Sequence, residues 1–494
     1  MSNSKSKVFR QAIKFPISVQ RALVPQNLTK ERVRWMLNKA YNPQFVYDTG
    51  LLEQEIKRAE ELRACLSHFY VEHCQKQTYA DRFISTELSL QLEVLKDSAT
   101  LLRRVLLNQL SADSGALDFP NSRHAIARVF CLPTPHELKL AEMLRTDCYN
   151  NVITEHLFDD DESSYDQTAL VTLIERFLHD FGGNTDHPEI NALRAKTFNW
   201  QDITDVCTTF LTYYCEMAKV PTPKLKFVHN YGLRKFGIQF EELSYKLNLT
   251  VPADMAFDGF QLLGALAHEL AHIHSSLTTG LMTKNLFPEH FSANLIANGP
   301  WRLPDEGFAK LSETSLCGEI GLAEPHYTLA AFYASQGHNF AETAEYLYDR
   351  VRRTPGQDSL LDAHVWETLN FFFGQTDTSG HSGFITPKDS CYFLGPLRVL
   401  RFLCDKGHIW YDEPLKLMRF SNLDFSLIKL INKHELSERE RFDPLGFWSL
   451  GHTPSGNLDP LQILKHILLE HSCSSSNQPI IDPEVSTHPM ADGY

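Results

Sequence analysis

Residues 264–275, which read GALAHELAHIHS, place the strongest constraint on the fold of this chain. Alanine and leucine dominate the stretch, and both residues favour an α-helix. The polar residues His268, Glu269 and His272 interrupt the apolar run as H-E-x-x-H. Residues four apart share one face of a helix, so the two imidazoles can point at one position. The stretch therefore predicts a mostly apolar helix with two histidines on the same side.

A helix of this kind can hold a metal ion. Two histidines supply nitrogen ligands, and the adjacent Glu269 can accept a proton from a water molecule. The alternative is a pair of ordinary core histidines, because the chain has 22 histidines and some pairs fall four apart by chance. The other His-Glu pairs begin at His136 and His434, and neither has a histidine four residues later. Burial of these polar groups without a partner would be unfavourable, which favours a metal site.

Composition limits the class of protein. The chain has 494 residues, 43% hydrophobic and 22% charged, which is ordinary for a globular protein with a large core. No run approaches the roughly 18 apolar residues of a membrane span, and no apolar segment follows the basic start as in a secretory signal. The ten cysteines form no C-x-x-C pair. We therefore expect reduced thiols, a cytoplasmic location and no transmembrane segment.

Charge is unevenly distributed along the chain. The net charge is −14, yet residues 1–41 contain nine basic residues and one acidic residue. This basic N-terminal arm could dock on the acidic remainder of its own chain or on an acidic partner, and we favour the first. Nucleic acid is not an expected partner of so acidic a protein.

Four regions are expected: the basic arm 1–41, a helical region 42–190 that ends after a turn-rich linker, a catalytic region 191–436 and an extension 437–494 with a disordered end. Strands are expected at 221–230 and 239–251, where apolar and polar residues alternate. The second strand precedes the H-E-x-x-H helix, and its free edge could pair with an extended peptide. Residues 278–304 read as loop. Helices are expected at 30–40 (after an N-cap at Asn27), 51–74, 87–110, 136–143, 170–180, 200–218, 327–336, 340–350, 364–373 and 386–404. Two further helices are expected to begin at about residue 260 and at residue 305.

A zinc site with two histidines needs a third protein ligand and one open position. The downstream candidates are Glu289, Glu306, Glu313 and Glu319. Glu306 is the best of them, because it begins a helix beside Gly307, where another backbone can approach closely. An equally good explanation is a carboxylate that satisfies free N–H groups at the helix start. Glu313 lies two turns further on the same face and could support the metal ligands.

Three further motifs carry a resemblance to a known family. The D-E-G-F-A of residues 305–309 resembles the Q-E-G-L-A signature of the flavohemoglobin-expression-modulating QEGLA-motif family, which includes the microtubule-associated tyrosine carboxypeptidases. The N-P-x-F-x-Y of residues 42–47 and the K-D-x-x-Y-x-x-G of residues 388–395 are similar to two other family motifs. Their common order extends the resemblance over residues 42–436.

The resemblance implies an α+β, predominantly α-helical, zincin-like metallopeptidase fold, with a small sheet beside the H-E-x-x-H helix. It also implies Glu306 as the third ligand of one Zn²⁺. The family usually has H-E-x-x-x-H, whereas Ile273 occupies the last position here and His272 comes one residue earlier. His274 is close in sequence, but on a regular helix it points away.

The expected function is zinc-dependent peptide hydrolysis, with Glu269 as general base. Tyr392 is the candidate oxyanion donor by resemblance, or else an ordinary core residue. By resemblance the enzyme is a carboxypeptidase that removes a C-terminal, tyrosine-like residue from a protein or peptide, with a tubulin-like substrate as one possibility. Lys388 is the candidate partner for the terminal carboxylate, or else a surface lysine, and Arg398 and Arg401 are weaker candidates. The alternatives are a non-catalytic helical interaction protein with a vestigial zinc site, or a zinc endopeptidase.

Overall fold

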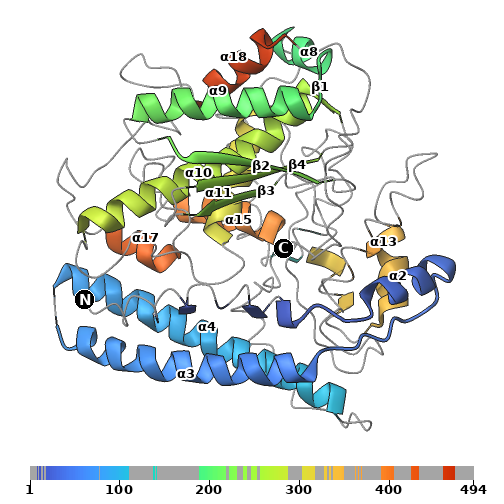
Figure 1. Cartoon of the computed structure of the whole chain (residues 1–494), viewed down its shortest axis with the longest axis vertical. Coiled ribbons are helices and arrows are strands. Elements are labelled where there is room, and N and C mark those ends of the chain that lie inside the picture. The colour runs from blue at the N-terminus through green and yellow to red at the C-terminus, as the bar shows by residue number, and fades with distance from the viewer. Residues whose placement is uncertain are drawn as a thin grey trace, which may run out of the picture. The chain divides into compact units, whose positions relative to one another are not determined.

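The computed structural model describes residues 21–76, 78–110, 188–218, 222–230, 237–241, 246–252, 256–286, 303–317, 328–330, 338–349, 391–404, 424–432 and 460–472, together with scattered single positions. This part of the chain is mostly helical and has two small sheets (Figure 1). None of its helices is both long and apolar enough to cross a membrane. The elements are α2 (Leu28–Leu37), α3 (Thr49–Cys74), α4 (Tyr79–Leu110), α8 (Pro188–Arg194), β1 (Thr197–Phe198), α9 (Trp200–Ala218), β2 (Lys224–Asn230), β3 (Gly237–Glu241), β4 (Lys246–Pro252), β5 (Phe257–Asp258), α10 (Gly259–Leu286), α11 (Leu303–Cys317), α13 (Phe340–Tyr348), α15 (Cys391–Cys404), α17 (Phe425–Asn432) and α18 (Pro460–Glu470).

The chain divides into two compact units. The first comprises Met1–Asp180, Ser275–Leu311 and Ile320–Phe442, and the second comprises Phe181–His274, Ser312–Glu319 and Asp443–Tyr494.

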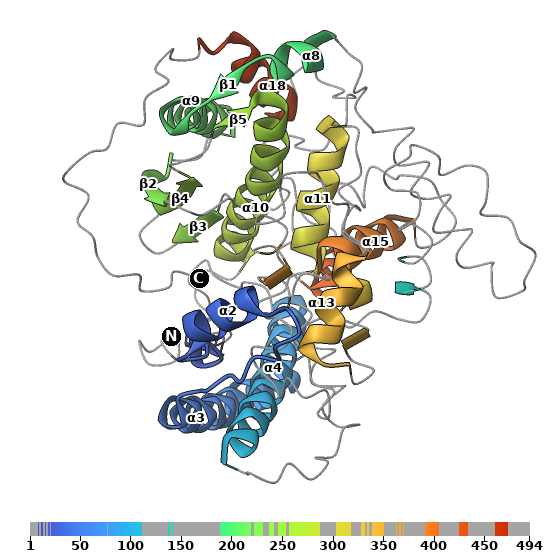
Figure 2. The same ribbon diagram turned by 90° about the vertical axis from the view of Figure 1, so that its right-hand side faces the viewer.

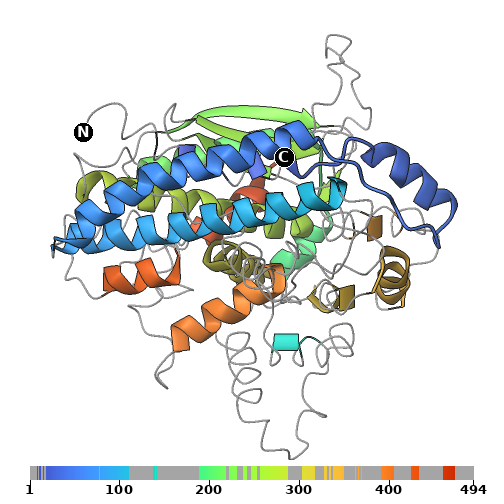
Figure 3. The same ribbon diagram turned by 90° about the horizontal axis from the view of Figure 1, so that it is seen from below.

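The long helices α3 and α4 form an antiparallel pair in the first unit (Figure 3). Asp48 caps α3 by accepting a hydrogen bond from the backbone N–H of Leu51. At the turn between the helices, His73 Nδ1 lies 2.8 Å from Asp81 Oδ1, and the Thr78 hydroxyl donates to the other oxygen of Asp81. These contacts join the end of α3 to the first turn of α4. The carboxylate acceptor stabilises that turn, because it faces the positive end of the helix dipole.

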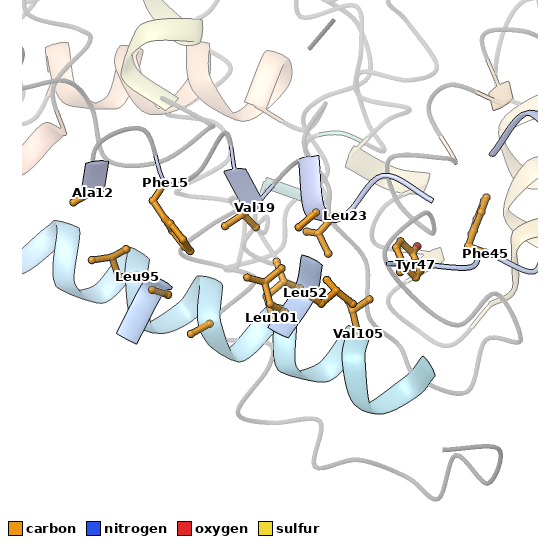
Figure 4. Close-up of a cluster of buried hydrophobic side chains, with 14 of the residues drawn as sticks. Ala12, Phe15, Val19, Leu23, Phe45, Tyr47, Leu52, Leu95, Leu101 and Val105 are labelled. Carbon is orange, nitrogen blue, oxygen red and sulfur yellow. The ribbon is translucent and has the colours of Figure 1, made fainter. Parts of the chain in front are cut away.

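The main core lies between this helix pair and the segments before and after it (Figure 4). Phe15, Val19 and Leu23 of the basic N-terminal segment are buried in this core. These three apolar residues of the segment pack on their own chain, whereas Val33 and Leu37 are exposed. Trp35 is fully buried, and its ring packs edge-on against Phe340 at a centroid distance of 5.9 Å.

The N-P-x-F-x-Y motif of residues 42–47 packs against this core and is hydrogen-bonded to α13. Asn42 Oδ1 accepts a hydrogen bond from the backbone N–H of Ala341 in the first turn of α13, while Phe45 and Tyr47 are buried. Asn27 stands at the N-cap position of α2, as predicted, but its side chain makes no capping hydrogen bond. Its side chain instead bonds the extended motif, donating to the carbonyl of Gln44 and accepting from the N–H of Val46.

The second unit contains both sheets. In the three-stranded sheet the order is β2-β4-β3, with β2 parallel and β3 antiparallel to β4. The single strand expected at 239–251 is therefore two strands, because the chain reverses between Glu241 and Lys246 and pairs with itself. β4 is hydrogen-bonded on both sides, so the predicted free edge for a peptide on this strand is wrong. The free edges of the described sheet belong to β2 and β3.

This sheet lies beside α10, as Figures 1 and 2 show, and α9 packs against β2 and β4. The position of α18 is set by Lys196, whose ammonium donates to the carbonyls of Leu468, Leu469 and His471 at the end of that helix. A cation there stabilises the negative end of the helix dipole. His471 also lies 3.3 Å from Asp202 of α9.

Most of the expected helices are confirmed where they can be tested. The bounds of α9 and the start of α10 agree with the prediction, and α4 begins eight residues earlier than predicted. The loop expected from residue 278 is wrong up to Leu286, because α10 continues to that residue. The helix expected at 170–180, the helix start at 386–389 and nearly all of the disordered end lie outside the described residues.

Candidate metal centre

α10 begins where Asp258 caps it, accepting hydrogen bonds from the backbone N–H groups of Phe260 and Gln261. Its first residue, Gly259, lies against the carbonyl of Leu193, where an added Cβ would be 2.7 Å from the oxygen. The helix therefore starts at a close backbone contact. The apolar residues around the histidines are buried, namely Leu262, Leu263, Leu266, Ala267, Leu270, Ala271 and Ile273.

The two predicted histidines meet on one side of α10. His268 Nε2 and His272 Nε2 are 3.3 Å apart, and their rings are inclined at 78°. Two nitrogens that bind zinc at about 2.0–2.1 Å in a tetrahedral site lie about 3.3 Å apart. Two imidazoles that share one proton could also approach to this distance, so the pair alone does not define a metal site.

Glu306 completes the group. It lies in the first turn of α11, and one ligand atom from each of His268, His272 and Glu306 falls within 4.8 Å of the others. All three side chains are partly buried. Two neutral nitrogens and a carboxylate oxygen are the donors that zinc accepts in catalytic sites. The donor set therefore fits one Zn²⁺, and the structure places the three predicted side chains close together.

Next to Glu306, α11 crosses α15 at very close range, which fixes this part of α11. A Cβ added to Gly307 would overlap the backbone carbonyl of Gly395 in α15. A Cβ added to Gly395 would lie 2.8 Å from Gly307 N and from the carbonyl oxygen of Leu303. The expected close approach at Gly307 is confirmed, and the partner backbone is that of α15.

Glu313 lies on the opposite side of the His268 ring from His272. Glu313 Oε2 is 3.6 Å from His268 Nδ1, and the two side chains are 27% and 14% exposed. Glu269, the expected general base, follows His268 directly on α10 and is partly buried.

His274 does not take part in this group. It is 2% exposed, and its Nδ1 lies 2.6 Å from the Tyr214 hydroxyl of α9. The expectation that His274 points away from the metal ligands is in agreement with this contact. No periodicity in the sequence identifies Tyr214 as its partner, because 60 residues separate the two.

The structure shows the surroundings of Tyr392, Arg398 and Arg401, the candidate oxyanion donor and two of the candidate partners of the terminal carboxylate. The ring of Tyr392 on α15 faces Lys310 of α11, whose Nζ is 5.5 Å from the ring centroid. Arg398 donates two hydrogen bonds to the buried carboxylate of Glu137, and Arg401 lies 3.8 Å from the same group. Both arginines are thus paired within the protein. Lys388 lies outside the described residues.

Comparison of the chain with protein-family models, with curated proteins and with solved structures finds no match.

Proposed function

We propose that the protein is a zinc-dependent metallopeptidase with a zincin-like fold. The observation that carries the proposal is the convergence of His268, His272 and Glu306, with Glu269 next to the first ligand. The resemblance to the QEGLA-motif family adds support, because it implies Glu306 as the third ligand, although the family has its second histidine one residue later than His272.

Each of the candidate residues would have a separate role in the reaction. His268, His272 and Glu306 would hold the ion, which when bound supplies a Lewis acid for the scissile carbonyl and lowers the pKa of water. Glu269 would accept a proton from the attacking water and deliver it to the leaving amine. Tyr392 would donate a hydrogen bond to the carbonyl oxygen as it gains negative charge.

We infer that the enzyme acts as a carboxypeptidase, and the family resemblance is the support for this. The substrate would be a protein or peptide with a free C-terminus, with an acidic tubulin-like tail as one candidate. Lys388 remains the proposed partner of the terminal carboxylate, since the pairing of Arg398 and Arg401 with Glu137 makes them poorer candidates. The described cysteines Cys65, Cys74, Cys207, Cys215 and Cys391 are free thiols, which supports a reducing, cytoplasmic location.

The deciding experiment compares the parent protein with Glu269→Gln. Zinc content is measured by elemental analysis, and cleavage of peptides with a free C-terminus is followed by mass spectrometry. We expect one zinc in both proteins and a loss of turnover of at least about 10²–10⁴-fold in the variant. Equal turnover would remove Glu269 from the mechanism, and a parent protein without zinc would refute the proposal.

C-terminally amidated copies of the same peptides test the exopeptidase assignment. A carboxypeptidase is expected to cleave only the free-carboxylate form, because its site must recognise the terminal charge. Equal cleavage of both forms, or internal cuts in each, would favour a zinc endopeptidase. Zinc binding with no cleavage of any peptide would favour the non-catalytic interaction protein.

A further inference from the structure

His268 is contacted on both of its ring nitrogens. Nε2 faces His272 at 3.3 Å, and Nδ1 faces Glu313 Oε2 at 3.6 Å. A neutral imidazole has one N–H donor and one lone pair, and the partner of one nitrogen decides which nitrogen carries the proton. The ionised carboxylate of Glu313 can accept a hydrogen bond from an N–H group but cannot donate one.

We propose that Glu313 is a positioning residue, which holds the proton of His268 on Nδ1 and so presents the Nε2 lone pair to the metal. This inference rests on the metal centre of the proposed function but not on peptide hydrolysis. A carboxylate in this position also fixes the orientation of the ring and makes the ligand nitrogen more basic. The distance of 3.6 Å is that of an ion pair and is longer than a hydrogen bond.

The geometry of α11 explains why one helix can serve both functions. Glu306 and Glu313 are seven residues apart, which places them about 20° apart around the axis and about 10 Å apart along it. They therefore share one face of α11, with Glu306 in the group of candidate ligands and Glu313 3.6 Å from His268 Nδ1. Partial burial reduces the screening of the charge on Glu313 by water.

The competing explanation is purely structural: Glu313 would join α11 to α10 and have no effect on metal affinity. Two variants and a control separate these explanations. Glu313→Ala removes the carboxylate, and Glu313→Gln keeps an acceptor oxygen but removes the charge. Glu345→Gln, on the exposed side of α13, is the matched control for the loss of one carboxylate.

Zinc affinity is measured by competition with a chelator, and the absorption spectrum of the cobalt-substituted protein reports the ligand geometry. We expect zinc to bind about 10–100-fold more weakly to Glu313→Ala than to the parent protein. The loss of affinity should be smaller for Glu313→Gln and absent for the control. The cobalt bands should shift in the Glu313 variants only.

Two results would overturn the proposal. One is a lower melting temperature of the metal-free Glu313 variants with unchanged zinc affinity and an unchanged cobalt spectrum. The other is a parent protein that binds no zinc, which would remove the metal centre as well. A parent protein that binds zinc but cleaves no peptide would refute only the peptidase proposal, since affinity and spectrum would still report the effect of Glu313.

Discussion

The substitution Gly307→Ala tests whether the crossing of α11 and α15 determines the position of Glu306. The added methyl would overlap the carbonyl group of Gly395 and lie 2.7 Å from Val399 Cγ2. Overpacking in a core costs about 1–3 kcal/mol, and the upper end applies because the obstacle is backbone. Alanine in a helix interior returns about 1 kcal/mol through its helix propensity. The net expected loss is therefore about 2 kcal/mol in the free energy of unfolding.

Urea titration followed by circular dichroism measures this loss. Gly50→Ala is the matched control, because its methyl would meet only Asp48 Oδ1, at an ordinary contact distance of 3.4 Å near the start of α3. We expect the control to unfold within about 0.5 kcal/mol of the parent protein. Relief of the overlap at Gly307 must also displace the neighbouring Glu306, so zinc should bind more weakly to this variant. A Gly307→Ala protein as stable as the control would refute the reasoning.

Two further predictions concern buried hydrogen bonds. Tyr214→Phe removes the hydroxyl bonded to His274 and should lower the free energy of unfolding by about 1–3 kcal/mol, as measured by urea titration. The control Tyr213→Phe, at a position 41% exposed, should change it little. Equal losses in the two variants would contradict a buried hydrogen bond between Tyr214 and His274. The hydroxyl of Thr78, more than any other group, lowers the pKa of Asp81 below its usual value of 3.8, so the folded protein binds this proton more weakly than the unfolded chain. The stabilisation from Asp81 should be complete above about pH 4 and disappear as the pH falls through the lowered pKa, and urea titrations between pH 2 and 6 should show that Asp81→Asn lacks this dependence.

Much of the candidate site could be predicted because it depends on local spacing. A separation of four residues places His268 and His272 together on any regular helix, and the bounds of α9 followed from apolar periodicity alone. The close approach at Gly307 followed from the absence of a side chain. Local rules failed where a turn interrupts a uniform pattern, as between β3 and β4, because alternation of apolar residues continues on both sides of the reversal.

The amino-acid sequence by itself thus indicated which residues of α10 share a face and which helix start offers a carboxylate as a candidate third ligand. Only the tertiary structure decided which residues far apart in the sequence come into contact, even where the sequence had offered one of them, Glu313, as a candidate. Glu313 meets His268 across 45 residues, Tyr214 meets His274 across 60, and Glu137 meets Arg398 across 261. Contacts over such separations depend on how helices pack, and packing is set by the summed burial of many side chains rather than by any short pattern. For the same reason β4 became a central strand, hydrogen-bonded on both sides, although its own sequence fits an edge strand equally well.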